Sequence, residues 1–203
     1  MTIKDLAKWF LIKNPTLRDG YIDENTKLNK LLYFSHLMYY AITDQNLTNC
    51  IFEKWDNGPV SREVYIAYRY EGLDCHYDDA ADIISQHILK ILQIVNFVYA
   101  NKTARELSEE THTHSIWQEV GRNEKIIFEN IAPKERNFMK CLYETYKDMD
   151  FERISMEKIG DNIYYYDKNN LDMSDDVVEQ LEKVDLQKEP IFVESIDGEL
   201  VFS

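Results

Sequence analysis

The segment DENTKLNKLLYFSHLMYYAI, residues 23–42, decides how this chain folds. It opens with acidic and amide residues, Asp23 to Thr26, of the kinds that cap the start of a helix. Lys27, Asn29 and Lys30 interrupt the apolar pattern that follows, and we expect them to form its solvated edge. The buried face of the predicted long helix is defined by Leu28, Leu31, Leu32, Ser35, Tyr39 and Ile42.

The residues after this helix predict a tight connection into a second helix. An apolar-aromatic run, Ile51 to Trp55, is followed by the break Asp56-Asn57-Gly58-Pro59. Because Pro59 has no backbone N–H to donate, it suits the first turn of a helix, and Ser61 offers a second N-cap. The aromatic side chains of the run are expected to wedge between the two helices. This pattern indicates a structural nucleus rather than a catalytic cleft.

The rest of the first 147 residues also reads as mainly helical. Thr103, with Glu106 three residues on, has the spacing of a capping box. Only 6 Gly and 4 Pro interrupt the chain, which favours helices over a many-turned sheet. We expect one compact helical domain over residues 1–147, with a few short strands. Its other helices are predicted over residues 3–13, from Ser61 to Tyr70, from Asp82 to Val98, over Ala104–Glu110, around Trp117 and from Pro133.

Beyond Lys147 the composition changes, and residues 148–203 are predicted to be an acidic C-terminal extension. Residues 171–203 hold 10 acidic and 2 basic side chains, a net charge of −8. Ser174 is expected to cap a helix that carries Val177, Val178, Leu181 and Val184. Asp197-Gly198 lies between alternating apolar residues and predicts a hairpin.

Acidic residues of this extension are the candidate partner-binding residues. Acids spaced among apolar residues suit an arm that docks on a basic groove and speeds encounter with its partner. The alternative is that the segment folds back on its own domain and the charge only solvates it. The candidates are Asp172, Asp175, Asp176, Glu179, Glu182 and Asp185.

Charge and cysteine usage limit the partner and the compartment. The net charge is −14, with a pI near 4.8, which argues against duplex DNA or an anionic membrane as the main partner. It favours a basic protein partner, or simply solubility. Cys50, Cys75 and Cys141 are distant and odd in number, and the charged start of the chain argues against a secretory leader. We therefore expect a cytoplasmic protein.

Reactive side chains form no recognisable catalytic or metal site in the sequence. His112 and His114 are too close for one helix face, and a zinc site needs about four ligands with recognisable spacing. We expect His112 to be a hydrogen-bonded core residue. Ser35 and His36 lack the strand–turn–helix surroundings of a nucleophile elbow. Three carboxylate pairs are expected to be solvated surface: Asp78-Asp79, Glu109-Glu110 and Asp175-Asp176.

Three short motifs stand in order along the first 147 residues: TKLNKLLY at 26–33, FEKWDNGPV at 52–60 and LSEETH at 107–112. Together they resemble the Panacea domain, also described as SocA-like or phage-associated GepA-like. The family often has Pro before the last motif Trp, where this chain has Ile116. The matching residues are Lys27, Leu28, Lys30, Leu31, Tyr33, Trp55, Gly58, Pro59, Val60, Tyr65, Leu107, Ser108, Thr111, His112 and Trp117.

This resemblance implies a mostly helical antitoxin of a bacterial or prophage toxin–antitoxin pair, which neutralises its toxin by direct binding. Toxins countered by the family include small alarmone-synthetase-like enzymes that modify tRNA. The family has no established catalytic residues, so its motif positions are expected to be architectural. We expect a non-enzymatic protein without cofactor or metal. Its expected partner is a cognate toxin with a basic surface, rather than nucleic acid or a membrane.

Two alternatives from other classes stay open. A phage or prophage interaction protein could act as a protease adaptor, as one relative does, or inhibit a host factor. A small enzyme with an uncharacterised site is the second alternative. A toxic neighbouring gene would favour the antitoxin over both.

Overall fold

The computed structural model describes residues 1–73, 84–187 and 190–202 of the chain. By its contacts the chain divides into two compact units, Met1–Asp148 and Met149–Ser203, and each is described by itself. The predicted helix start at Asp82, the Cys75-His76 pair and the Asp78-Asp79 pair lie outside the described residues.

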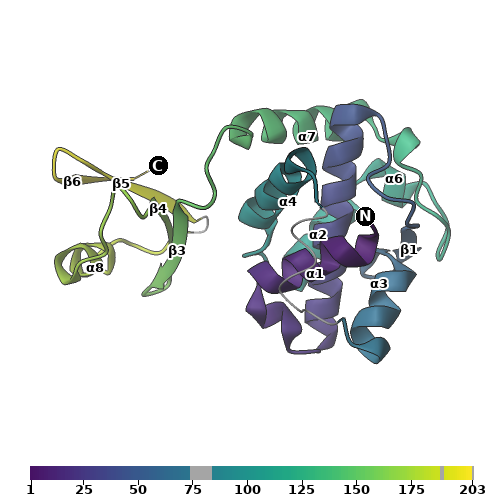
Figure 1. Ribbon diagram of the computed structural model, residues 1–203, viewed down its shortest axis with the longest axis horizontal. Coiled ribbons are helices and arrows are strands. Elements are labelled where there is room, and N and C mark those ends of the chain that lie inside the picture. The colour runs from purple at the N-terminus through teal and green to yellow at the C-terminus, as the bar shows by residue number, and fades with distance from the viewer. Residues whose placement is uncertain (74–83, 188–189, 203) are drawn as a thin grey trace. The chain divides into compact units, whose positions relative to one another are not determined.

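The first unit is mainly helical and is arranged around α2, which contacts α1, α3, α4, α5 and α7 (Figure 1). A short hairpin follows α2 in the chain. The elements are α1 (Ile3–Lys13), η1 (Pro15–Arg18), α2 (Ile22–Thr43), β1 (Glu53–Trp55), β2 (Gly58–Val60), α3 (Arg62–Ile66), η2 (Ala67–Glu71), α4 (Gln86–Tyr99), α5 (Ala104–His112), α6 (Ser115–Gln118), η3 (Phe128–Asn130) and α7 (Pro133–Tyr146).

The start of α2 differs from the prediction. The expected capping residues, Asp23–Thr26, lie inside the helix, and the N-cap is Tyr21, whose side chain makes no capping hydrogen bond. The helix is also buried over more of its surface than one amphipathic face. Asn29 and Lys30, predicted on a solvated edge, are fully buried because β2 and α5 pack against α2. Lys27 is half-buried.

The other end of the predicted face is less covered than expected. Leu28, Leu31 and Leu32 are fully buried, whereas Tyr39 and Ile42 are only half-buried. The turns of α2 from Asn25 to Met38 are therefore the most completely buried. These are the turns that carry the first motif.

The tight connection after α2 is a β-hairpin that leads into the predicted second helix, α3, and the prediction that Pro59 lies in the first turn of this helix was wrong. Strands β1 and β2 pair antiparallel, with Trp55 opposite Gly58. Gly58 has a φ of +94°, a left-handed conformation that closes short hairpins and suits glycine. Pro59 therefore lies in β2 instead of a helix. Ser61 is the N-cap of α3, but its side chain makes no capping bond.

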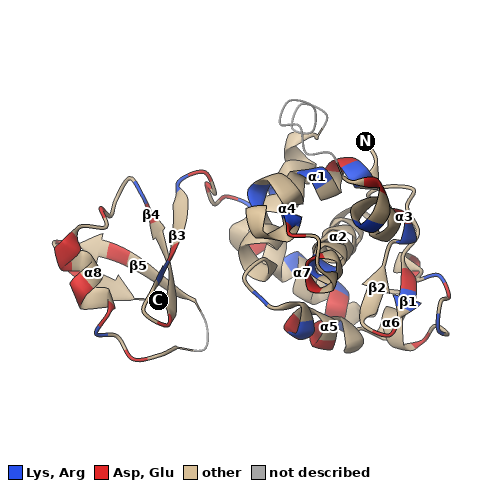
Figure 2. Cartoon of the chain, turned by 90° about the horizontal axis from the view of Figure 1, so that it is seen from below, with Lys and Arg blue, Asp and Glu red and all other residues tan. Residues whose placement is uncertain are grey.

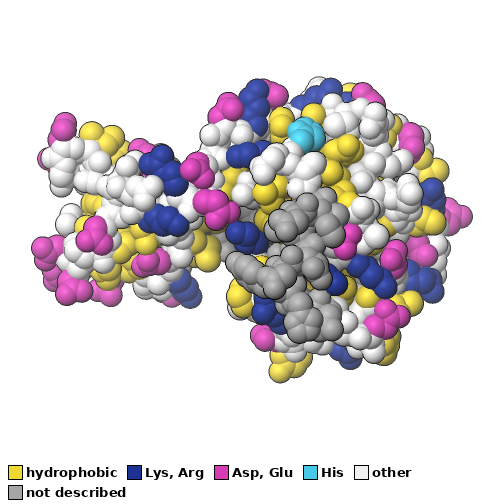
Figure 3. Space-filling view, in the orientation of Figure 1, with side chains coloured by type: hydrophobic (Ala, Val, Ile, Leu, Met, Phe, Trp, Pro, Cys, Tyr) yellow, Lys and Arg dark blue, Asp and Glu magenta, His cyan; other side chains and the backbone are white. Residues whose placement is uncertain are grey.

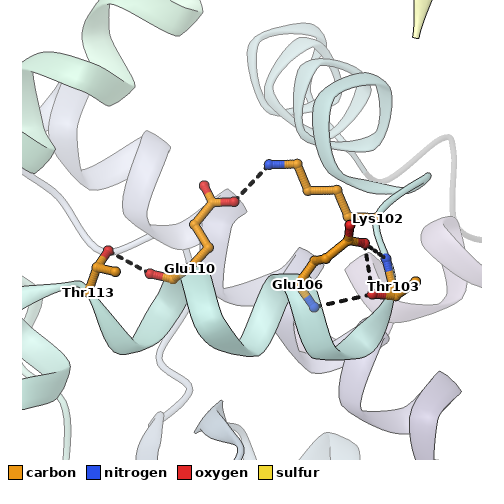
Figure 4. Close-up of polar contacts among 5 residues, drawn as sticks. All are labelled: Lys102, Thr103, Glu106, Glu110 and Thr113. Atoms are coloured by element: carbon orange, nitrogen blue, oxygen red, sulfur yellow. Dashed lines mark hydrogen bonds and ion pairs between the residues drawn. The ribbon is translucent and has the colours of Figure 1, made fainter. Parts of the chain in front are cut away.

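Several helices follow the prediction closely. The capping box of α5 is present: the Thr103 Oγ1 atom accepts from the Glu106 N–H, and the Glu106 carboxylate accepts from the Thr103 N–H (Figure 4). This helix extends to His112, beyond the expected end at Glu110. Helix α7 begins at Pro133, as predicted. Phe138, however, points outward from α7 with 52% of its surface exposed.

The second unit contains more β-structure than predicted. It consists of β3 (Ile154–Ile159), β4 (Asn162–Asp167), α8 (Asp175–Leu181), β5 (Ile191–Ile196) and β6 (Glu199–Phe202). The strands form one four-stranded sheet in the order β3-β4-β5-β6, in which β4 and β5 pair in parallel. The predicted helix and hairpin are present, but the β3–β4 hairpin was missed. The extension is therefore a folded unit with its own sheet.

This unit has its own apolar core between α8 and the sheet. Its buried members are Ile159, Tyr164, Tyr166, Leu171, Leu181, Ile191 and Val193. Asp197 and Gly198 both have positive φ, +53° and +85°, the pair of conformations that a type I′ hairpin turn needs. Ser174 stands at the N-cap of α8, without a side-chain capping bond. No helix among the described residues is long and apolar enough to cross a membrane.

Candidate functional site

The motif residues converge on the β1–β2 hairpin, which packs against α2 and α5. The Lys30 Nζ atom donates to the Pro59 carbonyl at 3.0 Å. A Cβ atom on Gly58 would lie 2.5 Å from the Thr111 Oγ1 atom and 2.7 Å from the Lys30 Cε atom. Only glycine therefore fits where the first and third motifs meet the second.

Buried amide side chains fix the return of the chain into α3. The Asn29 Oδ1 atom accepts from the Ser61 N–H at 2.9 Å, and its Nδ2 atom donates to the Asn25 Oδ1 atom at 2.9 Å. The Asn25 Nδ2 atom donates in turn to the Tyr65 carbonyl at 3.3 Å. Because buried polar groups must be paired, this chain of bonds holds α3 in one position against α2.

Helix α5 fixes the turn of the hairpin from the other side. The Ser108 Oγ atom donates to the Asn57 carbonyl at 3.0 Å, and the Thr111 Oγ1 atom donates to the Ser108 carbonyl at 2.9 Å. These two hydroxyls belong to the third motif. Its Leu107 is fully buried, so the apolar and polar motif residues of α5 have different tasks.

A stacked column ties β1 to α6. The Lys54 Nζ atom lies 4.3 Å above the Trp117 ring and donates to the Gln118 and Val120 carbonyls. The His112 ring stacks on the Trp117 ring at a centroid distance of 4.1 Å. His112 is half-buried rather than a core residue, and its buried Nε2 atom has no hydrogen-bond partner. Burial, with help from the nearby lysines, lowers the pKa of His112.

Two hollows flank the Asn57 turn and together form what we call the hairpin groove. The first, the Trp55 hollow, has a volume of about 300 Å³, and the second, the Ser108 hollow, about 370 Å³. Thr26 and Asn57 line both. The Trp55 hollow is also lined by Ile22, Lys30, Tyr65 and Arg122. The Ser108 hollow is also lined by Asp23, Thr103, Glu109 and His112.

Lys30 is an unusual feature of the groove floor. Its side chain is fully buried, and burial lowers its pKa to about 7. The second motif supplies its acceptor, the Pro59 carbonyl. Lys30 therefore cross-links α2 to β2 as a hydrogen-bond donor, at the cost of removing an amine from water.

The six candidate partner-binding acids lie in the second unit, apart in sequence from the motif residues. Asp175, Asp176 and Glu179 stand on α8, where acidic positions are marked in Figure 2. Asp172 precedes this helix, and Glu182 and Asp185 follow it. All six are exposed, and acidic side chains are spread over the visible face of this unit in Figure 3.

One nucleophile–base contact that sequence reasoning missed joins Cys50 to His36. The Cys50 Sγ atom lies 3.4 Å from the His36 Nε2 atom, while the His36 Nδ1 atom contacts the Leu32 carbonyl at 2.8 Å. Burial raises the pKa of the Cys50 thiol to about 11 and lowers the pKa of His36 to about 4. The pair is therefore a thiol beside a neutral imidazole, unlike an activated thiolate. No spacing rule would have joined two residues on either side of the α2 end.

The other reactive candidates are accounted for by local bonds. Ser35 is buried and donates to the Leu31 carbonyl at 2.8 Å. Glu109 pairs with Arg105, and Glu110 pairs with Lys102, each at 2.8 Å (Figure 4 shows the Lys102–Glu110 pair). Among the described residues, no three or more His, Cys, Asp or Glu side chains are placed to hold a metal ion.

One protein family matches the motif-bearing part of the first unit. Residues 28–118 match the family described as antitoxin SocA-like, Panacea domain. The matched span runs from the first motif to the end of α6 and includes the hairpin and α5. Over these residues the chain is similar to the SocA-like Panacea domain, a family described as antitoxins. No curated protein and no solved structure matches the chain.

Proposed function

We propose that this protein is the antitoxin of a toxin–antitoxin pair and neutralises its cognate toxin by direct, stoichiometric binding, without catalysis. The Panacea domain match over residues 28–118 carries this proposal. The contacts of the motif residues support it. Gly58, Lys30, Ser108 and Thr111 are used to fix a hairpin between helices, which makes a rigid binding scaffold.

The charge of the second unit supports a basic toxin surface as the partner. Residues 149–203 contain 15 acidic and 5 basic side chains, a net charge of −10, compared with −14 for the whole chain. A toxin that grips tRNA, as a small alarmone-synthetase-like enzyme would, must present a basic groove. We propose that the acids on and around α8 occupy such a groove, since complementary charge speeds encounter and improves specificity.

Co-expression with the product of the neighbouring gene tests this function. If the protein is a direct antitoxin, it restores growth and co-purifies with the toxin, and the amount of toxin in the cell is unchanged. If the toxin disappears only in cells that contain an intact protease, the protein acts as an adaptor and direct neutralisation is wrong. Failure to restore growth against any neighbouring product would contradict the antitoxin proposal itself.

A further inference from the structure

The rim of the Trp55 hollow exposes more apolar surface than a structural role requires. Ile22, in the first turn of α2, lines the hollow with 60% of its surface exposed. Tyr21 beside it is 69% exposed. Grouped exposed apolar side chains around a concavity are typical of interaction sites.

Three other side chains that line the hollow, Trp55, Tyr65 and Arg122, are of the types that contribute most binding energy at protein interfaces. Trp55 is half-buried, with its ring 5.1 Å from the Tyr65 ring and its Nε1 atom donating to the Glu53 carboxylate at 2.9 Å. The guanidinium carbon of Arg62 lies over the Trp55 ring, 5.7 Å from its centroid. The aromatic wall is therefore held in place before any partner arrives.

The floor of the groove is fixed in the same way. Lys30 bonds to the Pro59 carbonyl, Asn29 bonds to the Ser61 N–H, and Ser108 bonds to the Asn57 carbonyl. A groove whose walls are already ordered loses little conformational entropy on binding, which favours affinity. Its smaller hollow, about 300 Å³, is at the lower limit for whole small ligands and suits one large side chain of a protein partner.

The charges that line the Ser108 hollow favour a basic side chain of the partner there. Arg122 is paired with Asp56 at 2.7 Å, and Arg105 is paired with Glu109 at 2.8 Å, so these four side chains largely cancel. Asp23 is an exposed carboxylate on the rim of the Ser108 hollow. The first 148 residues hold 22 acidic and 18 basic side chains, so this unit is acidic as well.

We propose that the hairpin groove docks an exposed segment of the toxin, which inserts one large apolar side chain into the Trp55 hollow and places a Lys or Arg beside Asp23. This inference rests on the proposed antitoxin function and assigns a contact surface to the Panacea domain itself. The acidic second unit then adds long-range attraction, while the groove supplies the short-range contacts.

Binding of the purified product of the neighbouring gene tests the groove. The variant is Ile22→Glu, and its matched control is Phe138→Glu, which places the same charge on another exposed apolar side chain, on α7. Glu in the first turn of α2 is compatible with the helix dipole, so the melting temperature should be kept. We expect Ile22→Glu to raise the dissociation constant on the order of 30-fold, as for an interface hot spot, and Phe138→Glu to leave it within about twofold.

A second variant tests the charge. Asp23→Lys should lower the association rate and weaken its dependence on salt, because a rim charge acts mainly on encounter. If wild type binds and both groove variants bind equally well, the toxin docks elsewhere, so the inference is wrong while the antitoxin function stands. If wild type itself fails to bind, the proposed function fails, and the groove proposal with it.

Discussion

Replacing Lys30 by Met tests whether the first motif acts as a buried cross-link. Lys30 has a pKa of about 7 in the folded protein, against 10.5 for an ordinary lysine. Between these two values the unfolded chain binds a proton that the folded chain does not. The stability of wild type should therefore rise with pH across this window, and the rise should be absent in Lys30→Met.

The magnitude follows from the same two pKa values. Keeping the amine buried costs the folded state roughly 4 kcal/mol at pH 7 and roughly 2 kcal/mol at pH 9. Wild type should thus gain about 2 kcal/mol of unfolding free energy relative to Lys30→Met over this interval. Loss of the bond to the Pro59 carbonyl lowers the unfolding free energy of Lys30→Met by about 1 kcal/mol or more, equally at pH 7 and at pH 9.

Urea unfolding at pH 7, 8 and 9, followed by circular dichroism, measures this difference. Subtracting Lys30→Met from wild type removes the titration of groups common to both proteins. Lys134→Met, a replacement of an exposed lysine on α7, controls for loss of a positive charge. A difference between wild type and Lys30→Met that stays constant from pH 7 to 9 would refute the buried-amine reasoning.

Two further substitutions probe the scaffold. Gly58→Ala should lower the unfolding free energy by about 3 kcal/mol, because the new methyl group meets Thr111 and Lys30 at a positive φ. Gly20→Ala, at φ +78° with no neighbouring atom within 4 Å, should cost only about 1 kcal/mol in the same denaturation assay. Equal losses of unfolding free energy for the two variants would contradict the close contact of Gly58 with Thr111 and Lys30. Thr103→Ala should cost about 1 kcal/mol by removing the capping box of α5. Ser174 makes no side-chain capping bond, so Ser174→Ala should change stability by less than about 0.5 kcal/mol. A larger loss for Ser174→Ala than for Thr103→Ala would contradict this difference between the two caps.

Local signals in the sequence were sufficient for some elements and insufficient for others. The α5 capping box and the α7 start at Pro133 depend on residues within one turn, so they could be predicted. The start of α2 could not, because Tyr21 caps it without a side-chain bond. The burial of Lys30 depends on β2 and α5, which arrive from later in the chain.

The second unit shows what a fuller use of turn signals would have found. Gly160-Asp161 is a two-residue hairpin signal between Ile154–Ile159 and the aromatic run Asn162–Asp167, and β3 and β4 pair around it. The hairpin groove was beyond sequence reasoning, since Ile22, Trp55 and Arg122 meet only in the folded unit. Their exposure cannot be deduced from spacing.

The most direct test of the account is a titration of toxin activity with this protein. At concentrations far above the dissociation constant, residual activity should fall in a straight line and reach zero at a fixed small-integer ratio of antitoxin to toxin. Toxin recovered from the complex by denaturation and refolding should be fully active and unchanged in mass. Inactivation by far less than an equimolar amount, or a covalently altered toxin, would show that the protein acts as an enzyme.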